Sequence, residues 1–384
     1  MEKVRLGIIG VGNMGSSHIR NYLKNEMPEF IITAVCDIKE DRLEWAKEQL
    51  PDVKTFNDAS ALMDSGEVDA ILIATPHYFH PPMVIEGLNK GLHVMSEKPA
   101  GVYTKQVREM NEVAKKSNKI FGIMFNQRTN CLYRKAHEIV HSGKYGELKR
   151  VTWIITDWYR TQAYYNSGGW RATWSGEGGG VLLNQCPHQL DLWQWICGMP
   201  EKITAVCHEG KWHDIEVEDD VTAYLEYKNG ATGVFITTTG DAPGTNRLEV
   251  TGTKGTLICD SQTLEFVKLK VDEREHCVTS KEGFAKPEKD GRVTVETDGE
   301  NPQHIGVLRA FGDKILGKGE LIAEGHEGIN GLTLSNAMHL SSWTDKKITL
   351  PIDEDAFYVE LEKRIKTSRK KEGKSVTLNT EGSY

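Results

Sequence analysis

The sequence predicts an α/β protein of two domains: a doubly wound parallel sheet, then an α+β domain with a mostly antiparallel open sheet. Three observations support this fold class. A glycine-rich turn follows an apolar run near the N-terminus, short apolar runs alternate with helical patterns as far as Phe125, and longer strand-like stretches joined by tight turns follow. The 384 residues suffice for two hydrophobic cores. We therefore place the domains at residues 1–125 and 126–384.

The glycine turn follows the apolar run Val4 to Ile9 and precedes a segment with helical spacing. Strand, glycine turn and helix together are typical of a dinucleotide-binding Rossmann domain. Gly10 would allow the tight turn, Gly12 the approach of a pyrophosphate, and Gly15 the close packing of helix on strand. Asn13 and Met14 would open the helix, whose N-terminus favours anions. The alternative is a glycine turn that binds nothing.

Asp37 ends the next apolar run and predicts the choice of cofactor. A carboxylate at this spacing accepts hydrogen bonds from ribose hydroxyls and repels a 2′-phosphate, so NAD is favoured over NADP. Lys39 and Arg42 lie close behind, which leaves some use of NADP open. The alternative for Asp37 is an acid that serves a turn at the end of a strand.

The remaining elements follow from hydrophobic periodicity. The first domain contains predicted strands at Val4–Gly10, Ile31–Cys36, Ala70–Ala74, His93–Ser96 and Ile120–Phe125. The second contains a helix at Tyr133–Ser142 and strands at Lys149–Thr156, Thr204–His208, Val221–Tyr227, Gly233–Thr239 and Leu248–Thr251. Residues 279–303 are polar and lack periodicity, which predicts an excursion at the edge of the sheet. The segment 353–372 begins with acids and ends with bases, which predicts a C-terminal helix whose end is exposed to solvent.

Composition excludes several classes of protein. A formal net charge of −8 argues against a partner nucleic acid, and no run of about 18 apolar residues is long enough for a membrane span. The first strand begins too early to leave room for a signal peptide. The seven cysteines are scattered without C-x-x-C pairs, so we expect a reducing cytoplasm and no metal site.

Two polar segments follow predicted strands at the edge where open α/β sheets bind ligands. The first contains Thr75, Pro76 and His80, and the second contains Glu97 and Lys98 before a proline. An extended lysine at this edge can donate to a substrate oxygen, or act as a base if it is desolvated. The alternative is a charge pair on the surface.

The segment 178–191 begins with three glycines, which let the backbone approach a ligand. Asn184, His188 and Asp191 fall at helical spacing on one face, provided that the helix begins near Pro187. Histidine is suited to proton transfer near neutral pH. A buried structural histidine is the alternative.

Aromatic side chains crowd the stretch before those glycines and alternate with polar ones. They are Trp153, Trp158, Tyr159, Tyr164, Tyr165, Trp170 and Trp174. With Arg160 and Arg171 between them, they present flat apolar faces beside hydrogen-bonding groups, a combination that suits a sugar. They suit core or interface positions on a sheet as well.

Together these segments resemble the glucose–fructose oxidoreductase / inositol dehydrogenase (Gfo/Idh/MocA) family. The likeness rests on GIIGVGNMG at 7–15, ATPHYFH at 74–80, EKP at 97–99, NQR at 126–128 and GGGVLLNQCPHQLD at 178–191. It implies an NAD-dependent oxidoreductase of sugars or cyclic polyols, and a homo-oligomer built through the C-terminal sheet. Lys98 matches the EKP lysine that contacts cofactor and the reacting hydroxyl, and His188 matches the catalytic histidine.

The sequence departs from the family at Asn184, where an aspartate is usual, because an amide cannot take up a proton. Gln185 and Cys186 also differ, which indicates a subgroup with its own substrate. The NQCPHQLD form is similar to relatives that act on glycosides, including some that oxidise the hydroxyl at carbon 3.

We therefore expect an NAD-dependent dehydrogenase of a pyranoside, sugar or cyclic polyol. Lys98 and His188 would be catalytic, and Thr75, Pro76, His80 and Glu97 would bind the cofactor. The substrate would be bound by Asn126, Arg160, Tyr164, Tyr165, Arg171 and Asn184, besides the catalytic pair. Two alternatives remain: an enzyme that retains NAD and cleaves glycosides by oxidation, elimination and re-reduction, and a regulator that only binds NAD and sugar.

Overall fold

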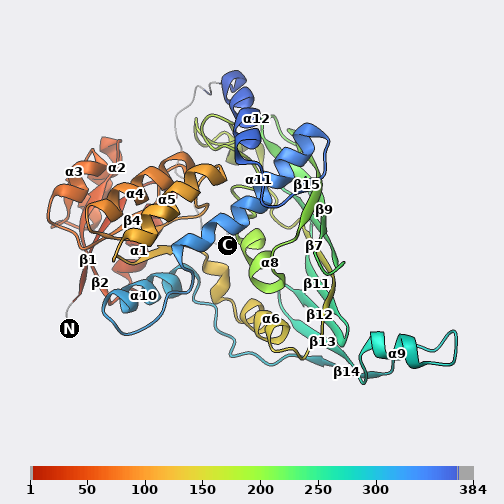
Figure 1. Cartoon of the computed structure of the whole chain (residues 1–384). Helices are drawn as coiled ribbons and strands as arrows, with labels where there is room; N and C mark the ends of the chain where they lie inside the picture. Colours follow the sequence, from red (N-terminus) through yellow and green to blue (C-terminus); the bar gives the residue numbers. More distant parts are fainter. Residues whose placement is uncertain (1–2, 370, 372–384) are drawn as a thin grey trace.

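A six-stranded parallel sheet forms the core of the N-terminal half (Figure 1), in a computed structural model that describes residues 3–369 and 371. Its strand order is β3-β2-β1-β4-β5-β6. The strands are β1 (Val4–Ile9), β2 (Phe30–Cys36), β3 (Lys54–Phe56), β4 (Ala70–Ile73), β5 (His93–Ser96) and β6 (Phe121–Ile123). The order reverses between β1 and β4, and the carboxyl ends of strands at such a point form a ligand site.

Helices cover this sheet on both faces, which confirms the doubly wound prediction. They are α1 (Asn13–Leu23), α2 (Glu40–Gln49), α3 (Ala59–Asp64), α4 (His80–Asn89) and α5 (Thr104–Lys116). All five predicted strands are present, and only the short edge strand β3 was not predicted. A sixth helix, α10 (Gln303–Ile315), returns from the C-terminal half and buries Val307, Leu308 and Phe311 in the core around β1 and β2.

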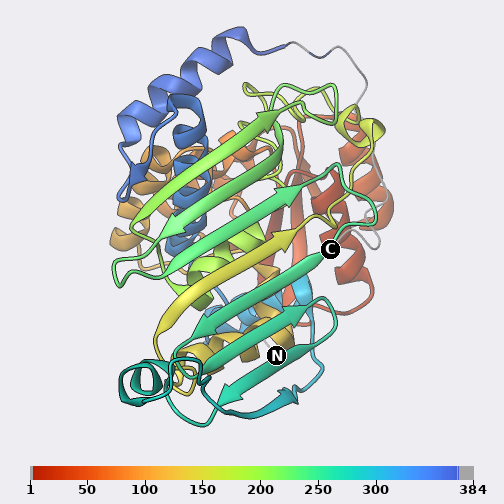
Figure 2. The same ribbon diagram turned by 90° about the vertical axis from the view of Figure 1, so that its right-hand side faces the viewer.

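The C-terminal half is built on a nine-stranded sheet with the order β14-β13-β12-β11-β7-β10-β9-β8-β15 (Figure 2). Its strands are β7 (Leu148–Ile155), β8 (Lys202–Glu209), β9 (Glu218–Glu226), β10 (Thr232–Thr238), β11 (Asn246–Gly252), β12 (Gly255–Asp260), β13 (Leu264–Leu269), β14 (Lys289–Thr294) and β15 (Ile348–Thr349). Only β7 and β10 pair in parallel, so the prediction of a mostly antiparallel sheet is confirmed. Strand β14 lies at the sheet edge, within the segment predicted to be an excursion there.

The helices of this half are α6 (Cys131–His141), α7 (Gln162–Tyr165), α8 (Pro187–Cys197), α9 (Glu273–Thr279), α11 (Gly328–Thr344) and α12 (Glu354–Thr367). Among the described residues, none of the molecule's helices is long and apolar enough to cross a bilayer.

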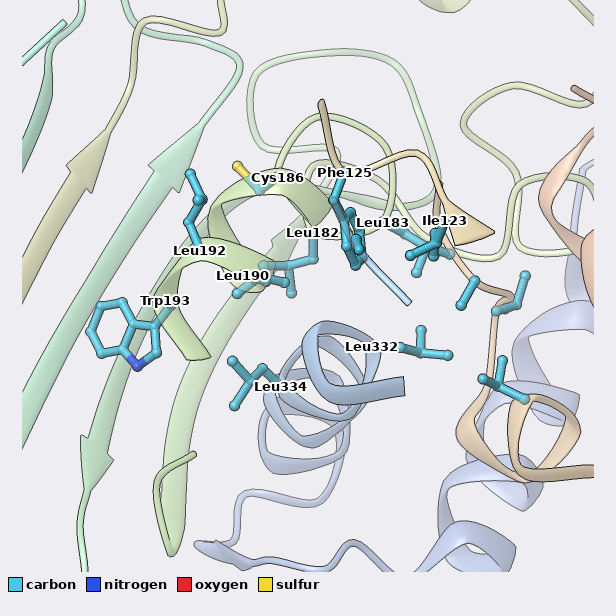
Figure 3. Packing of buried hydrophobic residues seen from close by; sticks show 14 of the residues in the cluster. Ile123, Phe125, Leu182, Leu183, Cys186, Leu190, Leu192, Trp193, Leu332 and Leu334 are labelled. Atoms are coloured by element: carbon cyan, nitrogen blue, oxygen red, sulfur yellow. The ribbon is translucent and has the colours of Figure 1, made fainter. Parts of the chain in front are cut away.

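One face of the large sheet is covered and the other is open. Val151, Trp153 and Ile155 alternate inward and are buried. Helices α8 and α11 pack on this inner face, and Leu192 and Trp193 of α8 point toward the sheet (Figure 3). Figure 2 shows no helix in front of the opposite face.

Helix α11 lies between the two sheets and packs against both halves of the chain (Figure 1). The side-chain amide of Asn336 accepts a hydrogen bond from the Thr104 N–H and donates one to the Val102 carbonyl, both at 3.0 Å. The carboxyl edge of the small sheet is thereby held toward the inner face of the large one.

The C-terminal helix α12 is shorter than predicted. It begins at Glu354, after an Asp353 cap that accepts from the Ala356 N–H at 2.9 Å, but it ends at Thr367. Ser368 bonds to Glu216, and Arg369 Nη1 donates to Asp214 at 2.6 Å. These long-range contacts draw the chain out of the helix, so the prediction that the helix continues through Ser368 and Arg369 is wrong. Residues 370 and 372 lie outside the described residues.

Candidate active site

Two glycines of the turn are closely packed against the backbone, and the third has free space around it. Gly10 has a φ of +92°, and a Cβ there would lie 2.6 Å from the Ala74 carbonyl oxygen. A Cβ on Gly15 would lie 1.9 Å from the Gly10 oxygen. At Gly12, the N-cap of α1, a Cβ would meet nothing within 4 Å. This helix N-terminus, whose first turn contains Asn13 and Met14, fits a pyrophosphate.

Asp37 is held against the same turn. Its carboxylate accepts from the Val11 N–H at 2.7 Å and from the Lys39 N–H at 3.0 Å. Arg42 donates to the Val11 carbonyl at 2.8 Å, and its guanidinium lies 5.0 Å from the Trp45 ring centroid. The carboxylate thus stands at the carboxyl end of β2, where a dinucleotide ribose would be bound.

The loop after β4 holds Thr75 and Pro76 at the sheet edge, with Pro76 capping the 3-10 helix η1 (His77–Phe79). His80 is buried, and its two ring nitrogens each lie 2.7 Å from a backbone oxygen, of Thr75 and of Pro99. The ring of His80 therefore joins the two ligand-edge loops to each other.

Glu97 and Lys98 are not a surface pair, so that alternative is wrong. Glu97 is buried and its Oε1 lies 2.9 Å from Nε2 of the equally buried His18. Burial would raise the pKa of Glu97, but the bond and charge of His18 outweigh it and lower that pKa to about 2. With its carboxylate occupied by His18, Glu97 leaves the Lys98 side chain to point elsewhere.

The Lys98 ammonium donates to the backbone oxygen of Asn184 at 2.9 Å. This contact joins the carboxyl end of β5 to the segment that precedes α8. Burial lowers the pKa of Lys98, while the charges of Glu97 and Glu177 oppose that shift. Lys98 is therefore a desolvated cation whose proton is easier to remove than that of a surface lysine.

His188 lies in the first turn of α8, which begins at Pro187 as the sequence predicts. It is 4% exposed. Burial and the nearby Lys98 charge hold the pKa of His188 well below its usual value, so the ring is neutral. Among the described residues its Nδ1 has no hydrogen-bond partner. A neutral imidazole with an unpaired nitrogen, beside a lysine ammonium, can accept a proton.

Asp191 does not join Asn184 and His188, so the shared face predicted for the three is wrong. Asn184 precedes α8, and the buried Asp191 accepts two bonds from Arg128, at 2.8 and 2.7 Å. The other end of Arg128 lies 2.8 Å from Glu327. These residues link α8 to the segments that contain Arg128 and Glu327.

Tyr164 and Arg171 lie at the Lys98–Asn184 contact. The Tyr164 hydroxyl accepts from Arg171 at 2.6 Å and from Gln185 at 3.1 Å, and donates to Asn184 Oδ1 at 3.4 Å. The Arg171 guanidinium lies 4.4 Å from the Tyr164 ring centroid, and that of Arg160 lies 5.2 Å from the same ring. Lys98, Asn184, Tyr164 and the two arginines therefore form one cluster, and His188 lies close enough for the Lys98 charge to lower its pKa.

Two predicted substrate residues face elsewhere. Tyr165 is 1% exposed and its hydroxyl lies 2.7 Å from the Thr239 hydroxyl, on the sheet side. Asn126 is fully buried, and its amide donates to Gln303 while its Oδ1 has no hydrogen-bond partner among the described residues. Both pack behind the cluster rather than at its centre.

Sequence reasoning missed Glu177, which precedes the three glycines and is 1% exposed. It bonds to the Asn184 amide, and its Oε1 lies 3.6 Å from Arg171. An acid directly before a glycine run is a weak signal. His18, which pairs with the distant Glu97, was also missed.

Comparisons with known protein families assign both halves of the chain. Residues 4–125 match the NAD-binding Rossmann fold of an oxidoreductase family, and residues 133–258 match the GFO/IDH/MocA C-terminal domain. A myo-inositol 2-dehydrogenase of Thermotoga maritima is 30% identical over 267 residues, which cover 67% of this chain and 75% of the relative. The chain belongs to the Gfo/Idh/MocA family. It is thus an oxidoreductase with an NAD-binding N-terminal domain.

Other members of the Gfo/Idh/MocA family match over more of the chain. A D-glucoside 3-dehydrogenase of Escherichia coli K12 is 23% identical over 367 residues, covering 90% of this chain and 97% of the relative. The structure of the WlbA dehydrogenase from Bordetella pertussis in complex with NADH and UDP-GlcNAcA superposes with a TM-score of 0.76. It is 25% identical, and the match covers 92% of this chain and 100% of the other.

Proposed function

We propose that this protein is an NAD-dependent dehydrogenase that oxidises a ring hydroxyl of a pyranoside, sugar or cyclic polyol. The proposal rests mainly on one contact: the Lys98 ammonium donates to the backbone oxygen of Asn184, four residues before His188, at the carboxyl edge of the NAD-binding sheet. The names of relatives that act on inositol and on glucosides support this substrate class.

The residues divide the work by their chemistry. Lys98 donates to the reacting oxygen and stabilises the charge that develops on it. His188, neutral and with a buried nitrogen that has no hydrogen-bond partner among the described residues, takes the hydroxyl proton. Arg160, Arg171 and Tyr164 hold the other hydroxyls, beside the ring of Tyr164. Bound NAD supplies the hydride acceptor.

Gly12, Asp37, Thr75 and Pro76 are the residues that would hold this cofactor. The open space at Gly12 and the carboxylate at the end of β2 fit the pyrophosphate and the ribose. Asp37 favours NAD over NADP because it repels a 2′-phosphate.

A redox-neutral reaction is the second candidate. A relative named glycosyl hydrolase family 109 protein 1, from Shewanella, is 28% identical over 194 residues, which cover 42% of it. In such a reaction the sugar would be oxidised, the aglycone eliminated and the product reduced again, so that NAD is regenerated. The oxidoreductase assignment favours either reaction over a regulator without activity.

A screen of inositols, free sugars and glycosides with NAD and NADP tests the dehydrogenase reaction and the redox-neutral reaction together. Absorbance of the reduced nicotinamide and the organic product are followed together. A sugar-dependent rise in NADH supports the dehydrogenase, whereas product without NADH supports the redox-neutral route. If neither appears with any sugar, while NADH still binds, the proposal is wrong.

We also propose that the protein works in the cytoplasm as a homo-oligomer formed through its large sheet. The outward side chains of the central strands support this. They include Ile154, Val206, Tyr224, Val234, Ile236 and Ile258, all half-buried or exposed. An apolar face of this extent favours association.

A further inference from the structure

Glu177 is a buried carboxylate in the site that the proposed mechanism leaves without a role. Its Oε1 accepts from the Asn184 side-chain amide, and its Oε2 accepts from the Ala172 N–H at 2.5 Å. The Arg171 guanidinium lies 3.6 Å from Oε1. Burial raises the pKa of Glu177, while the Arg171 charge and the bonds from Ala172 and Asn184 oppose that rise. Because every one of these three neighbours is a donor, the set fits an ionised carboxylate, which can only accept.

This contact fixes which way the Asn184 amide points. An asparagine carries a donor and an acceptor of nearly the same shape, and its neighbours decide their placement. Because Glu177 takes the NH₂ group, Oδ1 is turned toward the Tyr164 hydroxyl. Asn184 thus presents an acceptor on the side where Tyr164 and Arg171 lie.

The same carboxylate contributes negative charge near Lys98. The charged groups that act on Lys98 are Glu97, Glu177, Arg171 and Arg160, and the imidazoles that sense its charge are His77, His80, His188 and His304. Glu97 is already paired with His18. Glu177 is therefore the second acid that balances the Lys98 ammonium.

We propose that Glu177 is a positioning residue of the dehydrogenase site, which orients Asn184 as an acceptor for a sugar hydroxyl and holds negative charge beside Lys98. The inference rests on the proposed function. It explains why position 184 can carry an amide in this chain. The carboxylate that is usual at position 184 is replaced by that of Glu177, which accepts a hydrogen bond from the Asn184 amide.

The test is Glu177→Gln, which keeps the shape of the side chain and removes its charge. We expect kcat/KM to fall by about tenfold. One limb of the pH profile of kcat/KM should report the ionisation of Lys98, and we expect this limb to move by about one unit to lower pH. The direction is the same whether Lys98 must be charged or neutral, because loss of the acid lowers the pKa of Lys98 in both cases. The Kd of NADH, from fluorescence titration, should stay within about twofold, since Glu177 does not touch the glycine turn.

Two further variants separate this role from a structural one. Glu177→Gln/Asn184→Asp returns a carboxylate to the amide–acid pair and should move the limb back toward the wild-type pH. Asp219→Asn is the matched control, because Asp219 is a buried acid that accepts from the Lys211 and Trp212 N–H groups, away from Glu177 and Lys98. It should lower the melting temperature without moving the limb.

The outcomes distinguish the two proposals. If wild-type protein oxidises no sugar, the proposed function fails. If the wild type is active, and Glu177→Gln leaves the limb in place or the double variant does not restore it, Glu177 has only a structural role and the inference is overturned.

Discussion

The carboxylate of Asp37 accepts a hydrogen bond from the backbone N–H of Val11, at 2.7 Å, and so joins the end of β2 to the glycine turn. The two features that sequence reasoning used to predict a dinucleotide site are therefore in direct contact. Rossmann domains place a ribose-binding carboxylate at this strand end, so we expect this side chain to influence the choice between NAD and NADP.

Replacing Asp37 should shift cofactor use toward NADP. In Asp37→Ser the repulsion of a 2′-phosphate is lost, while Arg42 remains in place to meet it. We expect the ratio of kcat/KM for NADP to that for NAD to rise by roughly tenfold to a hundredfold. The control is Asp52→Ser, an exposed acid in the turn before β3, which should leave the ratio unchanged. An unaltered ratio in Asp37→Ser would show that this carboxylate does not face the ribose.

His188→Ala should impair turnover without weakening the binding of the cofactor. Loss of a proton acceptor lowers kcat by roughly 10²–10⁴-fold. Fluorescence titration with NADH should give a Kd close to that of the wild type. His141→Ala, which changes an exposed histidine at the end of α6, serves as the control. Near-normal turnover in His188→Ala would remove this residue from the mechanism.

Local patterns in the sequence predicted what local forces determine. Apolar runs located five strands of each sheet, because burial of those runs forms the core, whereas β3 and the strands from β12 to β15 were not predicted. The glycine turn was recognisable because no larger residue than Gly15 fits against the Gly10 oxygen. Pro187 located the start of α8, because proline suits the first turn of a helix.

Contacts between distant segments could not be predicted in the same way. The pairs Glu97–His18 and Asp191–Arg128 join residues that are 79 and 63 positions apart. Tyr165 follows Tyr164 directly, yet its hydroxyl bonds to Thr239 on the sheet while that of Tyr164 bonds to Asn184 and Arg171. The end of α12 was misplaced because acids at 214 and 216, rather than its own sequence, determine where the chain leaves the helix.

Breaking the buried ion pair of Arg128 should destabilise the fold. Arg128→Met leaves the Asp191 carboxylate buried without its partner, which costs about 3–5 kcal/mol. Calorimetry should show a melting temperature lower by roughly 10 °C. The double variant Arg128→Met/Asp191→Leu removes both charges and should recover much of the loss. If Arg128→Met has the same melting temperature as the wild type, the ion pair contributes nothing to the stability of the fold.

Glu97 should make stability depend on pH in the acid range. Its pKa is about 2 in the folded chain, against an ordinary value of 4.5. The stabilisation is therefore fully present above pH 4.5, and is lost as pH falls from there toward 2. Its size is about 3 kcal/mol. The difference in melting temperature between wild type and Glu97→Gln should be greatest at pH 5–6 and narrow toward pH 3; a constant difference would contradict this assignment.

Charge placed on the open face of the large sheet should dissociate the proposed homo-oligomer. Tyr224 and Ile236 lie on neighbouring strands and project outward, and Ile236 is directly opposite Ile154 of β7. Burying two lysine ammonium groups in such an apolar interface is costly, so Tyr224→Lys/Ile236→Lys should sediment as a monomer. Lys363→Glu on α12, outside this face, should sediment like the wild type. Because the active-site residues lie on the other side of the sheet, NADH binding should persist in the dissociated chain; identical sedimentation of the double variant and the wild type would exclude this face as the interface.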